Sequence, residues 1–145
     1  MKKTVCFSLA LLIYVLVSAQ GDITWTISHD KRKLFSSSIE NEEQNNLSVN
    51  LSDFKSGKDF IIAYWCDKTI NEKSDWKRSI GIYTPNDKEL YRHDADTVKI
   101  PDLEIKKMLQ QNKSIKVYTW ALPKDPKEAA RVRIRRVHLC TIMLK

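Results

Sequence analysis

Apolar and polar residues along much of the chain alternate with the two-residue period of β-strands. Five segments follow this pattern or form short apolar runs of strand length: residues 23–28, 47–51, 60–66, 115–122 and 132–144. The segment at residues 60–66 is an unbroken aromatic and β-branched run, which predicts a central strand buried on both faces. Pro123 is expected to end the fourth segment, because proline cannot donate to a strand ladder.

A turn signal separates two further predicted strands, at residues 79–83 and 88–92. Pro85 presets the backbone angle of a turn, and Asn86 and Asp87 are common turn residues. These segments therefore predict a β-hairpin.

Only two short segments have helical signals. Ile105, Met108 and Leu109 share one face of a helix predicted near residues 102–110, with Asp102 as its N-cap. Residues 125–128 place an acidic cap before a proline and predict a single helical turn.

About seven short strands with little helix predict an all-β fold, an antiparallel β-sandwich, rather than an α/β fold. Hydrophobic residues make up 42% of the chain and charged residues 30%, which is typical of a folded globular protein. The length is suited to one hydrophobic core, so a single domain is expected.

The N-terminus has the pattern of an export signal. Lys2 and Lys3 precede an apolar run at residues 5–17, which is too short to span a membrane and is followed by small residues. Residues 1–19 are therefore predicted to be a cleaved signal peptide and residues 20–145 the mature domain. The mature protein is expected to be secreted or periplasmic, with no membrane span.

Cys66 and Cys140 are the two cysteines of the predicted mature chain. In an oxidising compartment, two cysteines far apart in sequence are expected to form a disulfide. The alternative is a pair of buried free thiols, because cysteine is also an ordinary small core residue.

The positions of these cysteines resemble the inter-sheet bridge of immunoglobulin-like domains. Cys66 lies on an early predicted strand and Cys140 on a late one, and Trp76 follows Cys66 by ten residues. The chain departs from that family at His138, where the family's corner tyrosine would lie two residues before the second cysteine. The resemblance implies an immunoglobulin-like architecture and carries no function with it.

Arginines are concentrated near the C-terminus. Removing residues 1–19 leaves 23 basic and 18 acidic side chains, a formal net charge of +5. Arg131, Arg133 and Arg135 alternate with apolar residues, so a β-bulge near Arg135 and Arg136 would place a row of guanidinium groups on one sheet face. Because arginine binds carboxylates and phosphates, the predicted partner is an anionic envelope polymer or an acidic protein. The alternative is a solvated sheet face whose arginines pair with acids on neighbouring strands.

Tryptophans offer a second hypothesis, a carbohydrate-binding module that stacks a sugar on an exposed indole. Trp65 and Trp120 are expected in the core, and Trp76 lies in a polar segment and is the best candidate, with Trp25 next.

Signals for catalysis are few. Three glycines leave no phosphate-binding loop and no nucleophile elbow, so nucleotide chemistry is not expected. Asp94 and Asp96 provide too few oxygens for calcium, and no spacing of histidine and cysteine suggests zinc. The expectation is a non-enzymatic binding module without a cofactor, a metal or a nucleic-acid partner.

Overall fold

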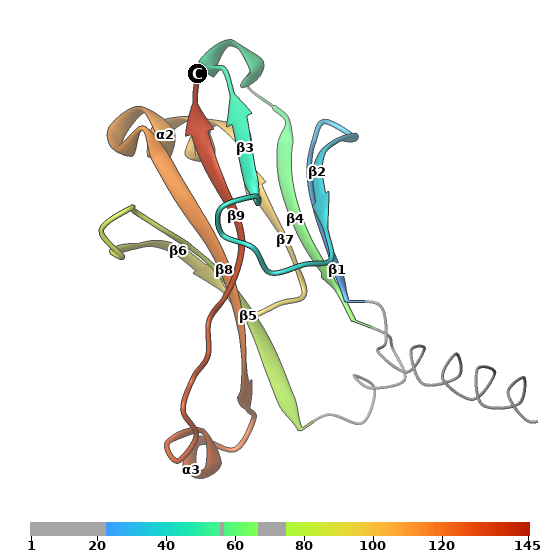
Figure 1. Cartoon of the computed structure of the whole chain (residues 1–145), viewed down its shortest axis with the longest axis vertical. Coiled ribbons are helices and arrows are strands. Elements are labelled where there is room, and N and C mark those ends of the chain that lie inside the picture. The colour runs from blue at the N-terminus through green and yellow to red at the C-terminus, as the bar shows by residue number, and fades with distance from the viewer. Residues whose placement is uncertain (1–22, 56, 67–74) are drawn as a thin grey trace, which may run out of the picture.

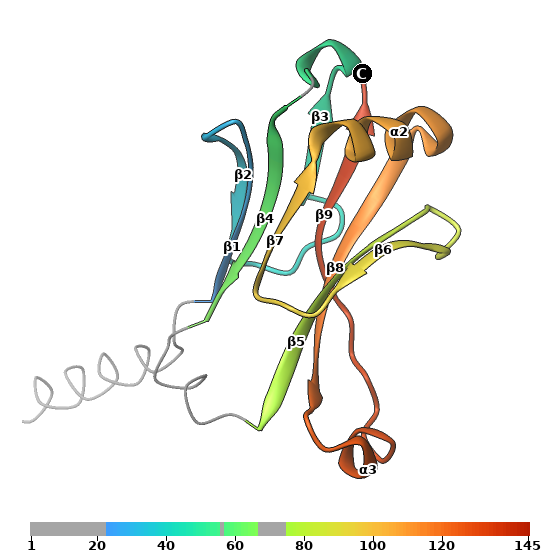
Figure 2. The same ribbon diagram turned by 180° about the vertical axis from the view of Figure 1, so that it is seen from behind.

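The computed structural model describes residues 23–55, 57–66 and 75–145, which form two β-sheets facing each other (Figures 1 and 2). The smaller sheet has the order β2-β1-β4-β7, with β1 (Thr24–His29), β2 (Arg32–Ser37), β4 (Asp59–Trp65) and β7 (Thr97–Pro101). The larger sheet has the order β3-β9-β8-β5-β6, with β3 (Asn46–Val49), β5 (Trp76–Tyr83), β6 (Glu89–His93), β8 (Ser114–Pro123) and β9 (Val137–Leu144). The predicted mostly β architecture is confirmed, with nine strands in the described part instead of about seven. The predicted signal peptide, residues 1–19, lies outside the described residues.

Three short helices accompany the strands within the described ranges: η1 (Leu51–Asp53), α2 (Asp102–Asn112) and α3 (Pro126–Ala129). The helix predicted near residues 102–110 is α2, but Asp102 is its first residue and not its cap. At α3 the prediction is confirmed, because the Asp125 carboxylate accepts a hydrogen bond of 2.8 Å from the Lys127 N–H. None of the helices in the described part of the chain has the length and apolarity needed to cross a membrane.

The core lies between the two sheets, where alternate residues of each strand point inward. From β4 these are Phe60, Ile62 and Tyr64, and from the facing strand β5 they are Ile80 and Ile82. The same cluster includes residues of β1, β7, β8, β9 and α2: Trp25, Ile27, Val98, Ile100, Ile105, Leu109, Ile115, Val117, Leu139, Cys140 and Ile142. Burying one such large apolar side chain contributes about 1.5–3 kcal/mol, so this cluster is the main stabilising element of the sandwich.

Strand β4 is fully buried on one face only, contrary to the prediction for residues 60–66. Ile61 and Ala63 are half-buried on the outer face, and Trp65 on that same face is 56% exposed. The outer positions are apolar in sequence, but no layer of described residues covers that face of the smaller sheet. Trp65 is therefore not a core residue.

The predicted hairpin is formed by β5 and β6. The Thr84 N–H donates to the Lys88 carbonyl at 2.8 Å, and the Asp87 N–H donates to the Thr84 carbonyl at 3.0 Å. Asp87 has a φ of 66°, a left-handed angle that Asp adopts more readily than most residues.

Strands β5 and β8 pair from Trp76 opposite Pro123 to Tyr83 opposite Lys116. Their lower halves and α3 extend past the smaller sheet, as both ribbon views show (Figures 1 and 2). We call this part, residues 75–78 and 121–136, the projecting end. Arg78 still reaches Tyr64 of the smaller sheet, and beyond it no strand of the described residues lies opposite this part.

The last strand is shorter than predicted, and Arg131, Arg133 and Arg135 do not lie on a sheet face. Strand β9 begins at Val137, which pairs with Thr119, and residues 131–136 run outside the sheet. The end of β8, from Trp120 to Pro123, is paired with β5 alone. Residues 131–136 therefore have no strand partner among the described residues, although apolar and polar residues alternate along them.

The β-bulge predicted near Arg135 and Arg136 is not formed, and the ladder of β8 and β9 instead has a bulge at Leu139. Cys140 pairs with Val117 and His138 pairs with Tyr118, which leaves Leu139 as the extra residue. A bulge allows two consecutive side chains to face the core, and both Leu139 and Cys140 are fully buried.

Cys66 and Cys140 are free thiols, so the predicted disulfide is not formed. Cys66 follows the end of β4 in the smaller sheet and is half-buried, whereas Cys140 lies within β9 of the larger sheet and is fully buried. The alternative of a buried free thiol therefore holds for Cys140. Its burial raises the pKa of the thiol to about 12.

Candidate functional site

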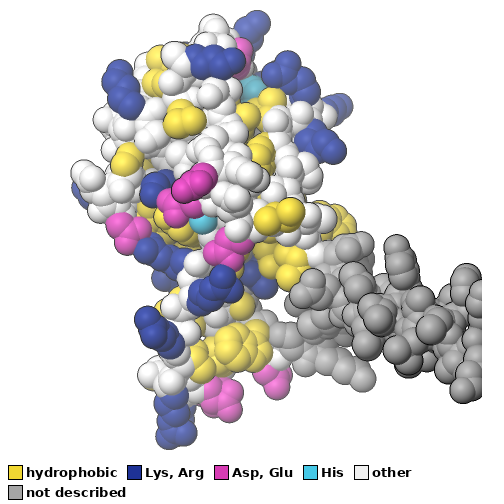
Figure 3. Space-filling model, viewed as in Figure 1, with side chains coloured by type: hydrophobic (Ala, Val, Ile, Leu, Met, Phe, Trp, Pro, Cys, Tyr) yellow, Lys and Arg dark blue, Asp and Glu magenta, His cyan; other side chains and the backbone are white. Residues whose placement is uncertain are grey.

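The segment between β8 and β9, residues 124–136, has the densest positive charge of the chain, and we call it the basic loop. It contains six basic and two acidic side chains: Lys124, Lys127, Arg131, Arg133, Arg135 and Arg136, with Asp125 and Glu128. Figure 3 shows Lys and Arg side chains along one side of the projecting end. Helix α3 fixes the first part of the loop, and the Arg131 N–H donates to the Glu128 carbonyl at 3.0 Å.

The predicted arginine row is divided between two roles. Arg131 and Arg133 are exposed and have no ion pair with the described residues. Arg135 donates to Glu40 at 2.6 Å, on the connection between β2 and β3. Arg136 donates to Asp87 at 2.7 Å and lies over the Tyr83 ring, 4.8 Å from its centroid. Arg131 and Arg133 are therefore the two arginines of the predicted row without an ion pair in the described part of the chain, whereas Arg135 is in a weak surface pair and stays 77% exposed.

Trp76 is the first residue of β5 and is 48% exposed, as predicted for the best candidate platform. Its indole borders an open hollow of about 400 Å³. The hollow is lined by residues of β5, the connection between β6 and β7, and β8: Trp76, Lys77, Arg78, Asp94, Ala95, Asp96 and Ala121. By strand register, Trp76 and Arg78 lie on the inner side of the larger sheet, at the edge of the region that the smaller sheet faces.

Arg78 is held in this hollow from three directions. Its guanidinium carbon lies 4.0 Å from the centroid of the Tyr64 ring, a cation–π contact across the two sheets. Its Nε is 3.5 Å from Asp96, and its Nη1 donates to the Thr119 hydroxyl at 3.3 Å. A long side chain fixed in this way loses little further freedom when it binds a ligand.

Asp94 is fixed in the same way on the other side of the hollow. Its carboxylate accepts a hydrogen bond from the Ser79 hydroxyl at 2.6 Å and one from Lys77 at 3.0 Å. These two bonds lower the pKa of Asp94. Asp94 and Asp96 each pair with a basic side chain, an arrangement suited to hydrogen bonding with a polar ligand.

The other tryptophans do not contribute to this site. Trp25, the second candidate platform, is 2% exposed in the core, and its indole N–H donates to the Leu139 carbonyl at 2.8 Å. Trp120 is buried as predicted, at 4% exposure, but it lies on the outer face of the larger sheet. Trp65 is exposed on the smaller sheet.

Lys77 and Arg78 were missed in the sequence because they follow Trp76 in what reads as a polar loop. The available signal was the two-residue spacing of Trp76, Arg78 and Ile80, which extends the predicted strand backward by three residues.

Comparisons of the chain with protein-family models, with curated protein sequences and with solved structures gave no significant match. The function is therefore argued from the geometry of the site.

Proposed function

We propose that this protein is an exported, non-enzymatic binding module whose projecting end holds an acidic polysaccharide. The observation that carries the proposal is the position of exposed Arg131 and Arg133 on a loop that begins beside half-exposed Trp76. Guanidinium groups bind carboxylates and sulfates, and an indole face stacks on a sugar ring. A sugar polymer that carries negative charge would use both the guanidinium groups and the indole face.

The loop and the tryptophan are joined by the strand ladder. Trp76 pairs with Pro123, and the Lys124 N–H donates to the Asp75 carbonyl at 2.6 Å. The basic loop therefore starts one residue from the cross-strand neighbour of Trp76. A polymer that occupies the hollow beside Trp76 can continue along the basic loop.

The hollow favours a sugar over an acidic protein segment. Its positive and negative side chains balance, with Lys77 and Arg78 against Asp94 and Asp96, so it has no charge reason to attract a carboxylate. Fixed polar side chains around an aromatic face suit the hydroxyl groups and the apolar face of a sugar ring. The excess positive charge lies outside the hollow, on the loop.

The pairing of Asp94 and Asp96 with basic side chains supports binding and not catalysis. A general acid or base must be free to exchange its proton with a substrate. Asp94 is engaged by Ser79 and Lys77, and Asp96 by Arg78. The buried thiol of Cys140 has a raised pKa, opposite to what a nucleophile requires.

We further propose that the fold is immunoglobulin-like, on the strength of its strand connectivity. The order β9-β8-β5-β6 corresponds to G-F-C-C′ of that architecture, and β1-β4-β7 corresponds to A-B-E. Strands β2 and β3 are additions between A and B, and no strand D lies between β6 and β7. In this correspondence Cys140 lies on strand G, so a bridge from B to F has no cysteine on F.

The proposal is tested by measuring the binding of the mature protein to polygalacturonate, poly-L-glutamate and dextran by isothermal titration calorimetry. Polygalacturonate is expected to bind most tightly, because it alone offers both sugar rings and carboxylates. Trp76→Ala is expected to weaken binding of polygalacturonate by up to about tenfold and to leave any weak binding of polyglutamate unchanged.

Three results bear directly on the choice of ligand. Equal affinity for polygalacturonate and polyglutamate would replace the polysaccharide with an acidic protein partner. Equal affinity for polygalacturonate and dextran would remove the role of the arginines. Binding of none of the three polymers would overturn the proposal.

A further inference from the structure

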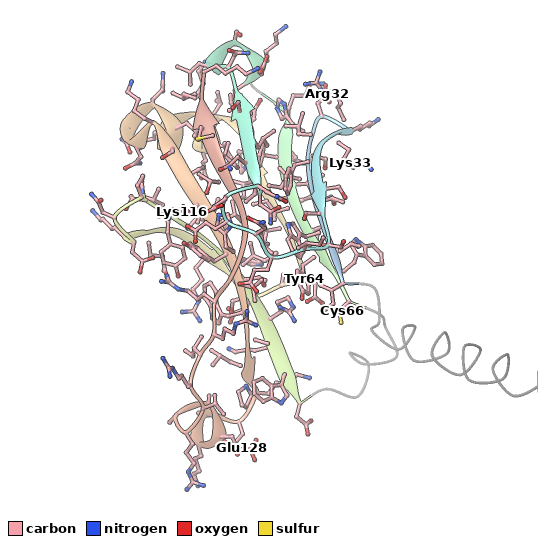
Figure 4. All side chains as sticks on the ribbon, viewed as in Figure 1. Arg32, Lys33, Tyr64, Cys66, Lys116 and Glu128 are labelled. Atoms are coloured by element: carbon pink, nitrogen blue, oxygen red, sulfur yellow. The ribbon has the colours of Figure 1, made fainter. Side chains whose placement is uncertain are left out.

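Two adjoining hollows of about 320 and 390 Å³ lie at the end of the molecule opposite the basic loop. They share His29, Arg32 and Asp53. Figure 4 labels Arg32 and Lys33 at this end and Glu128 of α3 at the other. The first hollow opens between β2 and β3, the edge strands of the two sheets, so both sheets contribute to its walls.

The hollows carry an excess of positive charge. Arg32, Lys33 and Lys55 line them and have no ion pair with the described residues, whereas Lys58 pairs with Asp30 at 2.8 Å. The carboxylate of Asp53 accepts a hydrogen bond from the Asn50 N–H at 3.0 Å and keeps its charge, so the basic side chains of the lining outnumber the acidic ones by two. Figure 3 shows dark-blue side chains gathered at this end of the molecule. The uncompensated cations are therefore on the walls of a concave surface.

His29 lies at the base of both hollows, and its ring contacts Asp102, Phe54 and Phe60. Its Nε2 is 3.5 Å from a carboxylate oxygen of Asp102, which is only 1% exposed in the first turn of α2. The imidazole also packs at 5.4 Å from the Phe54 ring and at 6.2 Å from the Phe60 ring. With Nε2 directed at Asp102, Nδ1 is the ring nitrogen left for a ligand.

The turn between β1 and β2 fixes Arg32 beside this imidazole. His29 and Arg32 are cross-strand neighbours, so their side chains leave the sheet on the same face. The two turn residues between them, Asp30 and Lys31, have φ of 47° and 65°. Positive φ at both central residues is what a two-residue hairpin turn requires, and this tight turn sets Arg32 directly opposite His29.

We propose that these two hollows are a binding site for a tetrahedral oxyanion, the phosphate or sulfate group of an ester. Arg32 offers two parallel N–H donors, which match two oxygens of such a group. Lys33 and Lys55 add charge from the rim. When both ring nitrogens of His29 carry a proton, Nδ1 donates a hydrogen bond to the oxyanion while Nε2 donates to Asp102. The site is distinct from the projecting end and shares no residue with it.

The test is an NMR titration of the full mature protein with inorganic phosphate and inorganic sulfate at constant ionic strength. The side-chain signals of Arg32 and the ring signals of His29 are expected to shift and to saturate, while those of Arg131 and Arg133 shift less. The variant Arg32→Ser with Lys33→Ser is expected to lose at least about tenfold in affinity. Lys99→Ser with Lys107→Ser makes the same change in net charge elsewhere and should leave the affinity unchanged.

A non-saturating response, or shifts confined to the basic loop, would overturn the proposal. The shifts are read on the unsubstituted protein, so the result stands even if the double variant fails to fold. The affinities for glucose 6-phosphate and glucose 6-sulfate are then compared. The ester that binds more tightly identifies whether the site takes a phosphate or a sulfate group. Loss of polysaccharide binding at the projecting end would not affect this outcome.

Discussion

Gly81 determines how the outer face of the larger sheet is packed. A Cβ at this position would lie 2.8 Å from the Trp120 ring and 2.8 Å from the Tyr83 ring. With no side chain there, the Trp120 ring packs against Gly81, and the Arg92 guanidinium lies 5.2 Å from the indole centroid. An aromatic ring that covers a glycine on a neighbouring strand is a recurrent way to stabilise a sheet.

Gly81→Ala is therefore expected to reduce the free energy of unfolding by about 1–3 kcal/mol, because the new methyl group displaces both rings. Urea denaturation measures this change. The loss should be smaller when the same substitution is made with Trp120→Leu, which removes the larger ring. An equal loss in both backgrounds would show that Trp120 is not what the methyl group meets.

The two thiols should differ in reactivity. Cys140 is fully buried and its thiol pKa is raised to about 12, so almost no thiolate forms at neutral pH. Iodoacetamide is expected to label Cys66 in the folded mature protein and Cys140 only after denaturation, as measured by mass spectrometry. If denaturation without a reductant exposed no thiol at all, the cysteines would be bridged and their free state in this structure would be wrong.

His138 makes the stability depend on pH. It is 4% exposed, its Nε2 lies 2.9 Å from the Thr141 hydroxyl, and its Nδ1 has no hydrogen-bond partner among the described residues. Burial lowers the pKa of His138. As the pH falls below about 6.5, the unfolded chain binds a proton at this residue before the folded one does.

The free energy of unfolding should therefore fall as the pH decreases from about 6.5 towards the lowered pKa, by at most about 1.4 kcal/mol per pH unit. Urea denaturation over this range measures the slope. His138→Gln is expected to flatten it, and His93→Gln, at an exposed position, is the matched control. An unchanged slope in His138→Gln would assign the dependence to other groups.

The turn between β1 and β2 contains a residue that fits its backbone angle poorly. Lys31 has a φ of 65°, an angle that costs a residue with a side chain about 1–2 kcal/mol and that glycine adopts readily. Because glycine also makes the unfolded chain more flexible, Lys31→Gly is expected to raise the free energy of unfolding by a net of about 0.5–1 kcal/mol. Lys99→Gly in strand β7 should lower it by about as much. Thermal or urea denaturation measures the free energy of unfolding of both variants. A lower value for Lys31→Gly than for the unsubstituted protein would contradict backbone strain at Lys31.

Elements with strong local signals could be predicted from the sequence: β4, the hairpin of β5 and β6, α2 and α3. Strands β2 and β7 could not, because each is short and has only two consecutive or alternating apolar residues. Both strands are fixed by pairing, β2 with β1 and β7 with β4, and pairing is not visible in a local pattern. The basic loop shows the reverse case, since residues 131–136 alternate like a strand but have no strand pairing.

Of the candidate site, Trp76, Arg131 and Arg133 could be named from residue type, but their arrangement could not. The exposure of Trp76 depends on where the smaller sheet ends, and the availability of Arg131 depends on which acids lie nearby. Arg135 pairs with Glu40, a residue far away in sequence. These are properties of the tertiary structure.

The molecule as a whole has one end where a sheet extends past its partner and where positive charge accumulates. The central claim is that this end binds an acidic polymer through Arg131 and Arg133. Both are exposed, so attraction to a polyanion should weaken as salt screens it, over a Debye length of about 10 Å at 0.1 M.

The most direct measurement is the affinity for polygalacturonate as a function of salt concentration, for the mature protein and two charge-matched variants. Arg131→Ser with Arg133→Ser is expected to weaken binding at low salt by about tenfold or more and to reduce its dependence on salt. Lys99→Ser with Lys107→Ser should leave both unchanged. Equal behaviour of the two variants would mean that net charge alone attracts the polymer and would contradict a specific site at the projecting end.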